Sequence, residues 1–372
     1  MAPTLLIGSC EPFSGKSAVV LGLGRQLIRR GVQLHFGKPL ATLVPGEPMP
    51  TGDPLLDADV RFVGATLGLA DDHLIPSLHV LAPSLVEQRL LTADLDPGPA
   101  FSDLCRQLAE APPSPGPEPS PSLALLEAAG SLHEGLLYGL SLPQLAERLE
   151  ASVLLVHLWT DSCSVDALLA ARQALGERLV GVVLNAVDPD GVAPLREQVA
   201  PALERLGIPV VGVMPRSPLL RSVTVEELAR RLQAQVLCCL DRLDLLVETL
   251  SIGAMNVNSA MEFFRRRRNM AVVTGADRTD IQLAALEAST QCLILTGAGE
   301  PLPQLVTRAE ELEVPLLKVE HDTLTTVEVI EQTFGHVRLH EAVKATYAMR
   351  LVEEHCDFSA LYQRLGLLAP AP

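Results

Sequence analysis

The fold is decided by residues 8–17, which read Gly-Ser-Cys-Glu-Pro-Phe-Ser-Gly-Lys-Ser. The apolar residues Thr4–Ile7 before this stretch predict a first strand, and Ser17–Arg30 predict a helix that ends at Gly31. A glycine-rich turn between a strand and a helix directs several backbone N–H groups and the positive end of the helix dipole to one point. The stretch therefore predicts a phosphate-binding P-loop.

The end of this loop is predicted to hold a nucleotide through Ser14, Gly15, Lys16 and Ser17. Lys16 would neutralise the β- and γ-phosphate oxygens, and the hydroxyl of Ser17 would hold Mg²⁺. The strict pattern has a glycine where this chain has Cys10, so the loop is a variant with Gly8 as its earlier glycine. An ordinary strand-to-helix turn is the alternative, but the position of Gly-Lys-Ser between an apolar strand and a helix disfavours it.

Length and composition predict a two-domain α/β protein, because 372 residues exceed the ~100–200 of one domain. Hydrophobic residues make up 48% of the chain and aromatic residues 3%, which predicts an aliphatic core. The net charge of −16 disfavours a nucleic-acid partner. Seven scattered cysteines without a C-x-x-C pair predict reduced thiols. The absence of a signal peptide and of an apolar run of ~18 residues predicts a cytoplasmic protein without a membrane partner.

Residues 1–215 are predicted to form the P-loop domain. Strand-like segments alternate with amphipathic helical patterns, which is typical of a parallel sheet covered by helices. The further predicted strands are Val32–Gly37, Leu123–Leu126, Val153–Leu158, Leu179–Leu184 and Val210–Val213. Prolines accumulate between residues 94 and 122, so an extended surface loop is expected to interrupt this domain.

Residues 216–340 are predicted to form a second, smaller α/β domain, with the boundary near Pro215–Pro218. Its predicted helices are Val223–Leu232, Asp280–Ala288 and Leu302–Leu312. Its predicted strands are Ile252–Val257, Met270–Thr274, Cys292–Thr296 and Pro315–Val319. A helical tail, residues 341–372, is expected to close the chain.

Four charged side chains are expected near the P-loop. Lys38 and Glu127 each follow a predicted strand, and ligands of parallel sheets gather at the carboxyl ends of strands. Asp57 and Asp59 open a helical segment. Mg²⁺ prefers oxygen ligands, so Asp59 and Glu127 are candidate metal-side carboxylates with Ser17. The alternatives are a helix N-cap for the aspartates and a solvated side chain for Glu127.

The first domain resembles dethiobiotin-synthetase-like ATPases, in the version fused to phosphate acetyltransferases. Besides the loop, the matching segments are 36–39 (Phe-Gly-Lys-Pro), 57–62 (Asp-Ala-Asp-Val-Arg-Phe), 127–133 (Glu-Ala-Ala-Gly-Ser-Leu-His) and 181–185 (Gly-Val-Val-Leu-Asn). The second domain resembles the DRTGG domain through residues 274–280 (Thr-Gly-Ala-Asp-Arg-Thr-Asp) and 293–297 (Leu-Ile-Leu-Thr-Gly). This order is that of the N-terminal part of long phosphate acetyltransferases.

The resemblance implies roles for the site residues and indicates that the acetyltransferase domain is absent. It implies phosphate and Mg²⁺ contacts for Lys16 and Ser17. It implies a phosphate or substrate contact for Lys38, which with Lys16 would form the catalytic pair. The amide of Asn185 would contact adenine. The chain ends soon after Leu367 without an acetyltransferase domain, so acetyl transfer is not expected. Two departures are Ala128, where the family has glycine, and Asp280-Ile281, where the DRTGG motif has two glycines.

Several charged residues and histidines allow more than one interpretation. Asp277 and Arg278 are either a cap and an ion pair after a strand, or an anion-binding or interface element. The run Arg265–Arg268 is interpreted as a solvated helix face in preference to an anion site. His133 and His157 are predicted to be isolated structural histidines, and the sequence predicts no zinc site.

These observations lead to three functional hypotheses. The first is a regulatory protein that binds Mg²⁺·ATP and transmits its nucleotide state through the DRTGG-like domain to a partner protein or a second copy of the chain. The second is an ATP-dependent ligase that activates a carboxylate or carbamate by phosphorylation. The third is a scaffold in which the P-loop is only structural. Homo-oligomerisation through the DRTGG-like domain is expected for all three.

Overall fold

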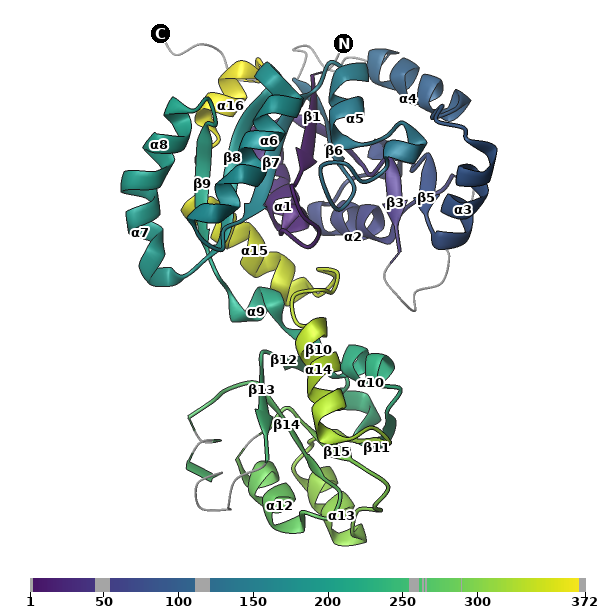
Figure 1. Cartoon of the computed structure of the whole chain (residues 1–372), viewed down its shortest axis with the longest axis vertical. Helices are drawn as coiled ribbons and strands as arrows, with labels where there is room; N and C mark the ends of the chain where they lie inside the picture. The colour runs from purple at the N-terminus through teal and green to yellow at the C-terminus, as the bar shows by residue number, and fades with distance from the viewer. Residues whose placement is uncertain are drawn as a thin grey trace. The chain divides into compact units, whose positions relative to one another are not determined.

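The computed structural model describes residues 3–43, 54–110, 121–253, 261–288 apart from 263 and 265, and 290–367. The chain forms two compact units (Figure 1). Unit 1 combines Met1–Arg216 with Arg338–Pro372, and unit 2 is Ser217–Val337. The C-terminal segment, expected as a separate tail, is thus part of unit 1.

Unit 1 is built on a seven-stranded sheet in which every neighbouring pair is parallel. Across the sheet the strands are β4 (Leu74–Ile75), β2 (Gln33–Gly37), β6 (Ser122–Glu127), β1 (Thr4–Gly8), β7 (Ser152–Leu158), β8 (Leu179–Val187) and β9 (Val210–Pro215). β1 lies between β6 and β7, with Ile7 in register with Glu127. The loop after β1 therefore starts beside the carboxyl end of β6, and the predicted parallel-sheet α/β fold is confirmed.

The helices of unit 1 are α1 (Lys16–Arg29), α2 (Ala58–Leu67), α3 (Pro83–Thr92), α4 (Pro99–Glu110), α5 (Leu142–Arg148), α6 (Val165–Leu175), α7 (Val192–Pro194), α8 (Ala200–Arg205), α15 (Ala342–His355) and α16 (Ser359–Arg364). A π-helical turn, Leu195–Val199, joins α7 to α8. A small parallel pair is formed by β3 (Leu40–Thr42) and β5 (His79–Leu81). Alternate strand residues such as Leu6, Leu126 and Leu155 share one aliphatic core with the inner faces of α5 and α6.

The expected extended loop over residues 94–122 is only partly present. Residues 99–110 form α4, with Phe101 and Leu104 buried in the core of unit 1. Pro99 opens this helix, a position where proline costs no hydrogen bond because the first N–H groups have no helical partner. The proline-rich residues 111–120 lie outside the described part of the chain.

The C-terminal segment joins unit 1 by packing α15 along α1. The side chain of Val352 covers Gly22, where an added Cβ would lie 2.4 Å from the Val352 Cβ. Arg25 and Arg29 donate to Glu353 at 2.6 and 3.1 Å. The hydroxyl of Tyr362 in α16 donates to Gln26 at 3.0 Å. One face of the P-loop helix is therefore covered by residues more than 300 positions later in the chain.

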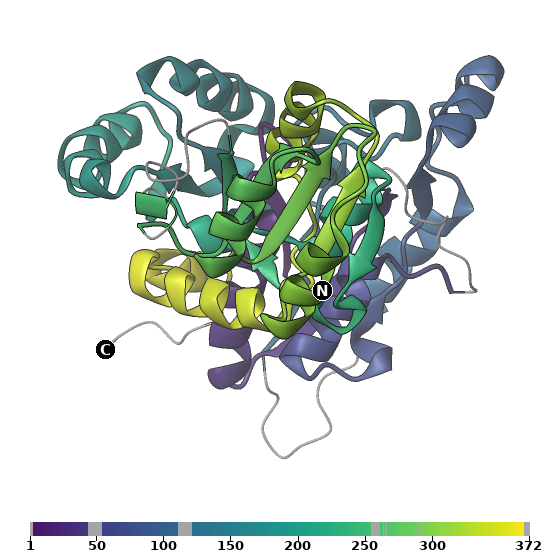
Figure 2. The ribbon, with the colours of Figure 1, turned by 90° about the horizontal axis from the view of Figure 1, so that it is seen from below.

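Unit 2 is a smaller α/β layer structure. Its sheet has the order β11 (Gln235–Cys238), β16 (Leu316–Val319), β15 (Cys292–Thr296), β14 (Met270–Gly275) and β13 (Thr249–Ile252), with only β11 antiparallel to its neighbour. β10 (Val223–Thr224) and β12 (Leu246–Val247) form an antiparallel pair. The helices are α9 (Pro218–Arg221), α10 (Val225–Leu232), α12 (Thr279–Glu287), α13 (Pro303–Glu311) and α14 (Thr323–Thr333). Figure 2 shows this sheet with helices packed against it.

The strands of unit 2 are apolar on both faces, as the three-layer arrangement requires. Val272 and Leu293 pack with α12 and α13, whereas Val273 and Ile294 pack with α10 and α14. The predicted helix over 223–232 begins only at Val225, because Thr224 caps it through its side chain. The predicted strand over 252–257 ends earlier, at Ile252, and residues 254–257 lie outside the described part.

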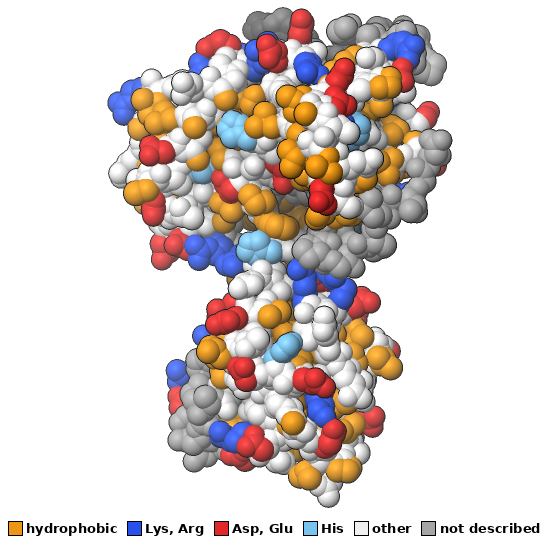
Figure 3. All heavy atoms as spheres, turned by 45° about the vertical axis from the view of Figure 1, so that its right-hand side comes forward, with side chains coloured by type: hydrophobic (Ala, Val, Ile, Leu, Met, Phe, Trp, Pro, Cys, Tyr) orange, Lys and Arg blue, Asp and Glu red, His pale blue; other side chains and the backbone are white. Residues whose placement is uncertain are grey.

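On the face drawn in Figure 3, acidic and basic side chains are interspersed over both units. Among the described residues, no helix is both long and apolar enough to cross a membrane.

The contact between α1 and α15 leads to a stability prediction. Gly22→Ala should lower the free energy of unfolding by about 1–3 kcal/mol, because the new methyl meets the branched Cβ of Val352, which no side-chain rotation removes. Gly24→Ala in the same helix is the matched control, since its methyl meets only terminal methyls of leucine side chains, Leu67 Cδ1 at 2.7 Å and Leu34 Cδ2 at 3.3 Å. Urea unfolding of both variants should separate them, and equal losses of stability would contradict this packing.

Candidate functional site

The P-loop turns into α1 at Gly15, which adopts a left-handed conformation with φ of 95°. A Cβ at this position would lie 2.3 Å from the Asn185 Nδ2 atom, so both the backbone and the neighbouring side chain require glycine. Asn185, from β8, donates this amide to the Ser14 carbonyl at 2.7 Å. Its predicted contact with adenine is untested, and its described contact holds the loop.

Lys16 is the first residue of α1, and its ammonium lies inside the loop. Its Nζ donates to the Ser9 Oγ at 2.9 Å and to the Gly130 carbonyl at 3.3 Å. The Ser9 hydroxyl donates to the same carbonyl at 2.7 Å. Burial lowers the pKa of Lys16, and the nearby carboxylate of Glu127 opposes that shift. The β1 loop and the segment after β6 thus converge on one cation.

Ser17 and Glu127 lie together at the ends of α1 and β6. The Ser17 hydroxyl donates to Glu127 Oε1 at 3.3 Å, while Glu127 Oε2 is buried and has no hydrogen-bond partner within the described part of the chain. Burial raises the pKa of Glu127, against the opposing charge of Lys38. A buried carboxylate oxygen without a hydrogen-bond partner favours the binding of a proton or a cation.

Lys38, which follows β2, is bound to two aspartates. Its Nζ lies 2.6 Å from Asp59 Oδ2 and 3.6 Å from Asp57 Oδ2, and it donates to Thr42 Oγ1 at 2.8 Å. Burial acts against the ammonium, but the carboxylates of Asp59, Asp57 and Glu127 outweigh it and raise the pKa of Lys38. Asp57 also caps α2 by accepting from the Asp59 N–H at 2.7 Å.

Two residues that the sequence interpretation missed complete this cluster. Arg338 is the first residue of the returning segment, and its Nη1 lies 3.0 Å from Asp57 Oδ1 and 2.8 Å from Asp59 Oδ2. Its other terminal nitrogen donates to the Thr42 carbonyl. His340 Nε2 lies 2.9 Å from Asp59 Oδ1. We call Lys38, Asp57, Asp59, Arg338 and His340 the ion-pair cluster.

The electrostatics of Asp59 follow from these partners. Burial alone would raise its pKa, but Lys38, the hydrogen bond from His340 and the charge of Arg338 hold that pKa well below its usual range. Oδ2 of Asp59 therefore faces two cations, and Oδ1 faces the His340 imidazole. Of the three predicted metal-side residues, the structure joins Ser17 directly to Glu127 and engages Asp59 with protein cations instead.

The remaining candidate residues make contacts of other kinds. In unit 2, Arg278 is the N-cap of α12, so Asp277 does not cap that helix, and the Arg278 Nε lies 3.5 Å from Asp280 Oδ1. Of the arginine run, Arg265 lies outside the described residues and Arg266 pairs with Glu262. In unit 1, His133 is exposed, whereas His157 is buried next to a cysteine and a glutamate, contrary to its predicted isolation.

Comparison with known proteins supports the two-part organisation. A family model described as an AAA domain matches residues 3–224, more than half of the chain, and one described as a DRTGG domain matches residues 227–333. Phosphate acetyltransferase of Nitratidesulfovibrio vulgaris is 26% identical over 98% of this chain and 52% of its own length. Phosphate acetyltransferase of Synechocystis sp. is 23% identical over the same shares. The chain thus spans about half the length of these curated relatives, and the expected resemblance is confirmed.

A solved structure is also similar. It contains the CBS and DRTGG domains of the regulatory region of Clostridium perfringens pyrophosphatase, complexed with its activator, diadenosine tetraphosphate. The identity is 22% and the TM-score 0.27, with 30% of this chain and 47% of that chain covered.

The ion-pair cluster leads to a pH-dependent prediction. Asp59→Asn should lower the free energy of unfolding by about 3–5 kcal/mol at neutral pH, because it leaves buried cations with one carboxylate fewer. The folded-state pKa of Asp59 lies below its unfolded value of about 3.9, so its contribution is present above that pH and is lost as the pH falls toward the folded pKa.

Urea unfolding of the wild type and Asp59→Asn should therefore converge on acidification. Asp71→Asn, at an exposed aspartate, serves as the control and should differ little from the wild type at any pH. A stability gap for Asp59→Asn that persists unchanged into strong acid would contradict the assignment.

Proposed function

We propose that this chain, which belongs to the AAA domain family through residues 3–224, binds Mg²⁺·ATP at its P-loop and acts as a regulatory protein through its DRTGG domain. One observation carries this proposal. Arg338, the residue directly after unit 2, is ion-paired with Asp57 and Asp59 beside the P-loop. The chain that leaves unit 2 is therefore held by carboxylates of the site where the nucleotide would bind.

The nucleotide part of the proposal rests on the loop. The N-terminus of α1, which has no side-chain cap, supplies backbone N–H groups and a positive dipole end. Lys16 brings a buried positive charge, which hydroxyl and carbonyl oxygens hold in place. A phosphate group would replace these neutral partners with stronger, charge-assisted hydrogen bonds. Asn185, which donates to the Ser14 carbonyl, would also contact the bound nucleotide.

The metal part rests on Ser17 and Glu127. Mg²⁺ takes oxygen ligands, and this pair offers a hydroxyl and a buried carboxylate with one oxygen unpartnered among the described residues. The residues present thus fit the ion. When bound, it would neutralise phosphate charge. Asp59 would join these ligands only by exchanging its contacts with Lys38, Arg338 or His340 for the metal.

This exchange supplies the regulatory step that we propose. A divalent cation near Asp59 competes with the Arg338 guanidinium for the same carboxylate oxygen. Breaking a buried ion pair costs about 3–5 kcal/mol, which exceeds the ~1–3 kcal/mol of typical allosteric coupling. Arg338 is bonded directly to Val337, the last residue of unit 2, so a change at Arg338 acts on the segment that follows α14. By linkage, a ligand or partner of unit 2 would change nucleotide affinity in turn.

The second candidate is an ATP-dependent ligase of the dethiobiotin-synthetase type. It is favoured by the nearness of Lys38 to Lys16. Burial is the main cause that lowers the pKa of Lys16, and the positive charge of Lys38 lowers it further. Two adjacent cations suit a transferring phosphoryl group. The regulatory proposal ranks first because Lys38 is already bound by Asp59, Asp57 and Thr42. ADP release stimulated by a small carboxylate or a diamine would reverse that order.

The nucleotide site is tested by calorimetric titration with Mg²⁺·ATP. Lys16→Ala should bind at least about tenfold more weakly, because it removes a charged hydrogen-bond donor to phosphate. Lys318→Ala, at a lysine of unit 2 paired with Glu300, is the control and should bind like the wild type. Unchanged affinity in a folded Lys16→Ala variant would refute the assignment of the P-loop.

The transmission step is tested by hydrogen exchange on the full chain. In the wild type, Mg²⁺·ATP should change amide exchange both in the P-loop and in α14 with the residues after it. In Arg338→Gln the P-loop response should persist and the α14 response should disappear. Arg350→Gln is the matched control, because Arg350 is exposed and its described contacts, with Glu354 and the ring of Tyr347, lie outside the ion-pair cluster. A wild-type response confined to unit 1 would exclude regulation through the DRTGG domain.

A further inference from the structure

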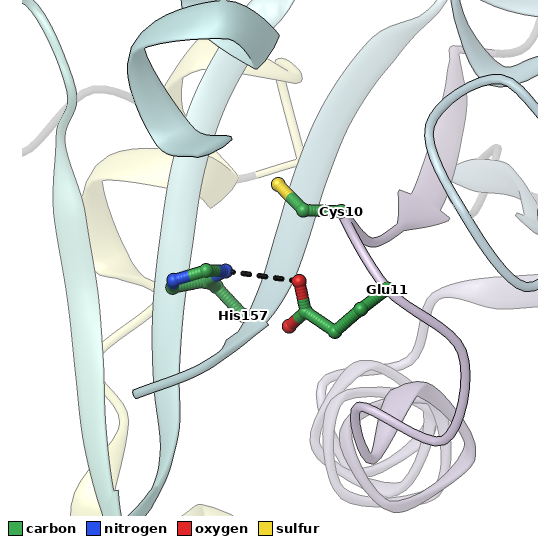
Figure 4. Close-up of side chains that lie close together, drawn as sticks. All are labelled: Cys10, Glu11 and His157. Carbon is green, nitrogen blue, oxygen red and sulfur yellow. Dashed lines mark ion pairs between the residues drawn. The ribbon is translucent and has the colours of Figure 1, made fainter. Parts of the chain in front are cut away.

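A second group of side chains meets on the other flank of the P-loop. Cys10 and Glu11 follow β1, and His157 lies near the end of β7 (Figure 4). One ligand atom from each lies within 4.8 Å of the other two. The neighbouring parallel strands explain this meeting, because Gly8 is in register with Leu155, so both chains reach the same edge of the sheet a few residues later.

His157 is the buried member of this group, with only 2% of its surface exposed. Its Nδ1 lies 3.2 Å from Glu11 Oε2. Neither ring nitrogen has a well-aligned hydrogen bond to any described residue. A buried polar group without such a bond costs about 1–3 kcal/mol and is rare in native proteins. The imidazole is thus a strong ligand that the protein itself leaves unsatisfied.

The two partners are oriented toward His157 by contacts of their own. The Leu158 N–H donates to Glu11 Oε1, which leaves Oε2 facing the imidazole. The Cys10 Sγ lies 3.6 Å from the Ala167 carbonyl. Burial, together with the charge of Glu11, raises the pKa of the Cys10 thiol to about 12. The thiol therefore keeps its proton until a cation replaces it.

We propose that Cys10, Glu11 and His157 form a binding site for a zinc-class divalent cation. Sulfur, imidazole nitrogen and carboxylate oxygen are the donors that Zn²⁺ combines, and three protein ligands leave a fourth position for water. Ligand distances of about 2.0–2.3 Å in a tetrahedral site require the separations between the three donor atoms to shorten by at most about 1.5 Å. Cys10 and Glu11 are only partly buried, so their side chains have room for that adjustment.

Such a site is distinct from the proposed Mg²⁺ site in both position and chemistry. Ser17 and Glu127 offer oxygen alone, which suits Mg²⁺, whereas a thiol and an imidazole select a softer ion. Cys10 also stands where the strict P-loop pattern has glycine. A cation bound there would tie the first turn of the loop to β7 and would require neither Lys16 nor a nucleotide.

Cobalt titration of the reduced full chain tests the proposal, because Co²⁺ bound to a thiolate gives a near-ultraviolet charge-transfer band. The wild type should bind one Co²⁺ with this band, and Zn²⁺ should displace it. Cys10→Ser should abolish the band, and Glu11→Gln should weaken binding by about tenfold or more. The matched controls are Cys105→Ser and His133→Gln, at a cysteine and a histidine outside the group, and both should bind like the wild type.

The possible outcomes separate cleanly. Loss of the band in Cys10→Ser with an unchanged melting temperature of the metal-free protein supports the site. A wild-type chain that forms no one-to-one complex overturns the proposal. So does a band that survives in Cys10→Ser or disappears in Cys105→Ser, because the thiolate would then lie elsewhere. Since His157→Gln alters a core residue, Glu11→Gln provides the second test through a partly exposed, isosteric change.

Discussion

The rest of unit 1 depends on the buried contact of Asp59 with two cationic side chains and a histidine. Removing a carboxylate, a guanidinium and an ammonium from water costs several kcal/mol for each ion unless they satisfy one another. Lys38 at 2.6 Å and Arg338 at 2.8 Å share one oxygen of Asp59, and His340 approaches the other. The cluster is stable only as a set, so the segment after unit 2 is needed to complete the domain that begins at the N-terminus.

This dependence would couple the proposed regulation to the proposed nucleotide site. The P-loop ends in Ser17, which contacts Glu127. The positive charge of Lys38, in the ion-pair cluster, acts to lower the pKa of Glu127. In the proposed function, a bound metal and phosphates would change the charge balance around Asp59. Since Arg338 is covalently continuous with unit 2, that change would act on the segment after α14.

The sequence predicted the parts of the site that local order determines. Lys38 and Glu127 each follow a strand, and parallel strands bring their carboxyl ends to one edge. It missed Arg338 and His340, because no local pattern links them to aspartates about 280 positions earlier. His157 seemed isolated for the same reason, since its neighbours Cys10 and Glu11 are brought to it only by strand pairing. The helix over residues 99–110 was not predicted, because the prolines around it indicated an extended loop.

The distance between the Arg338 Nη1 and Asp59 Oδ2 atoms in a crystal structure with Mg²⁺ and a non-hydrolysable ATP analogue tests the central claim most directly. This distance is 2.8 Å in the structure described above. We expect it to open beyond the ~4 Å limit of an ion pair, with the metal on Ser17 and Glu127. An unchanged Arg338–Asp59 contact beside a fully bound metal–nucleotide would contradict it.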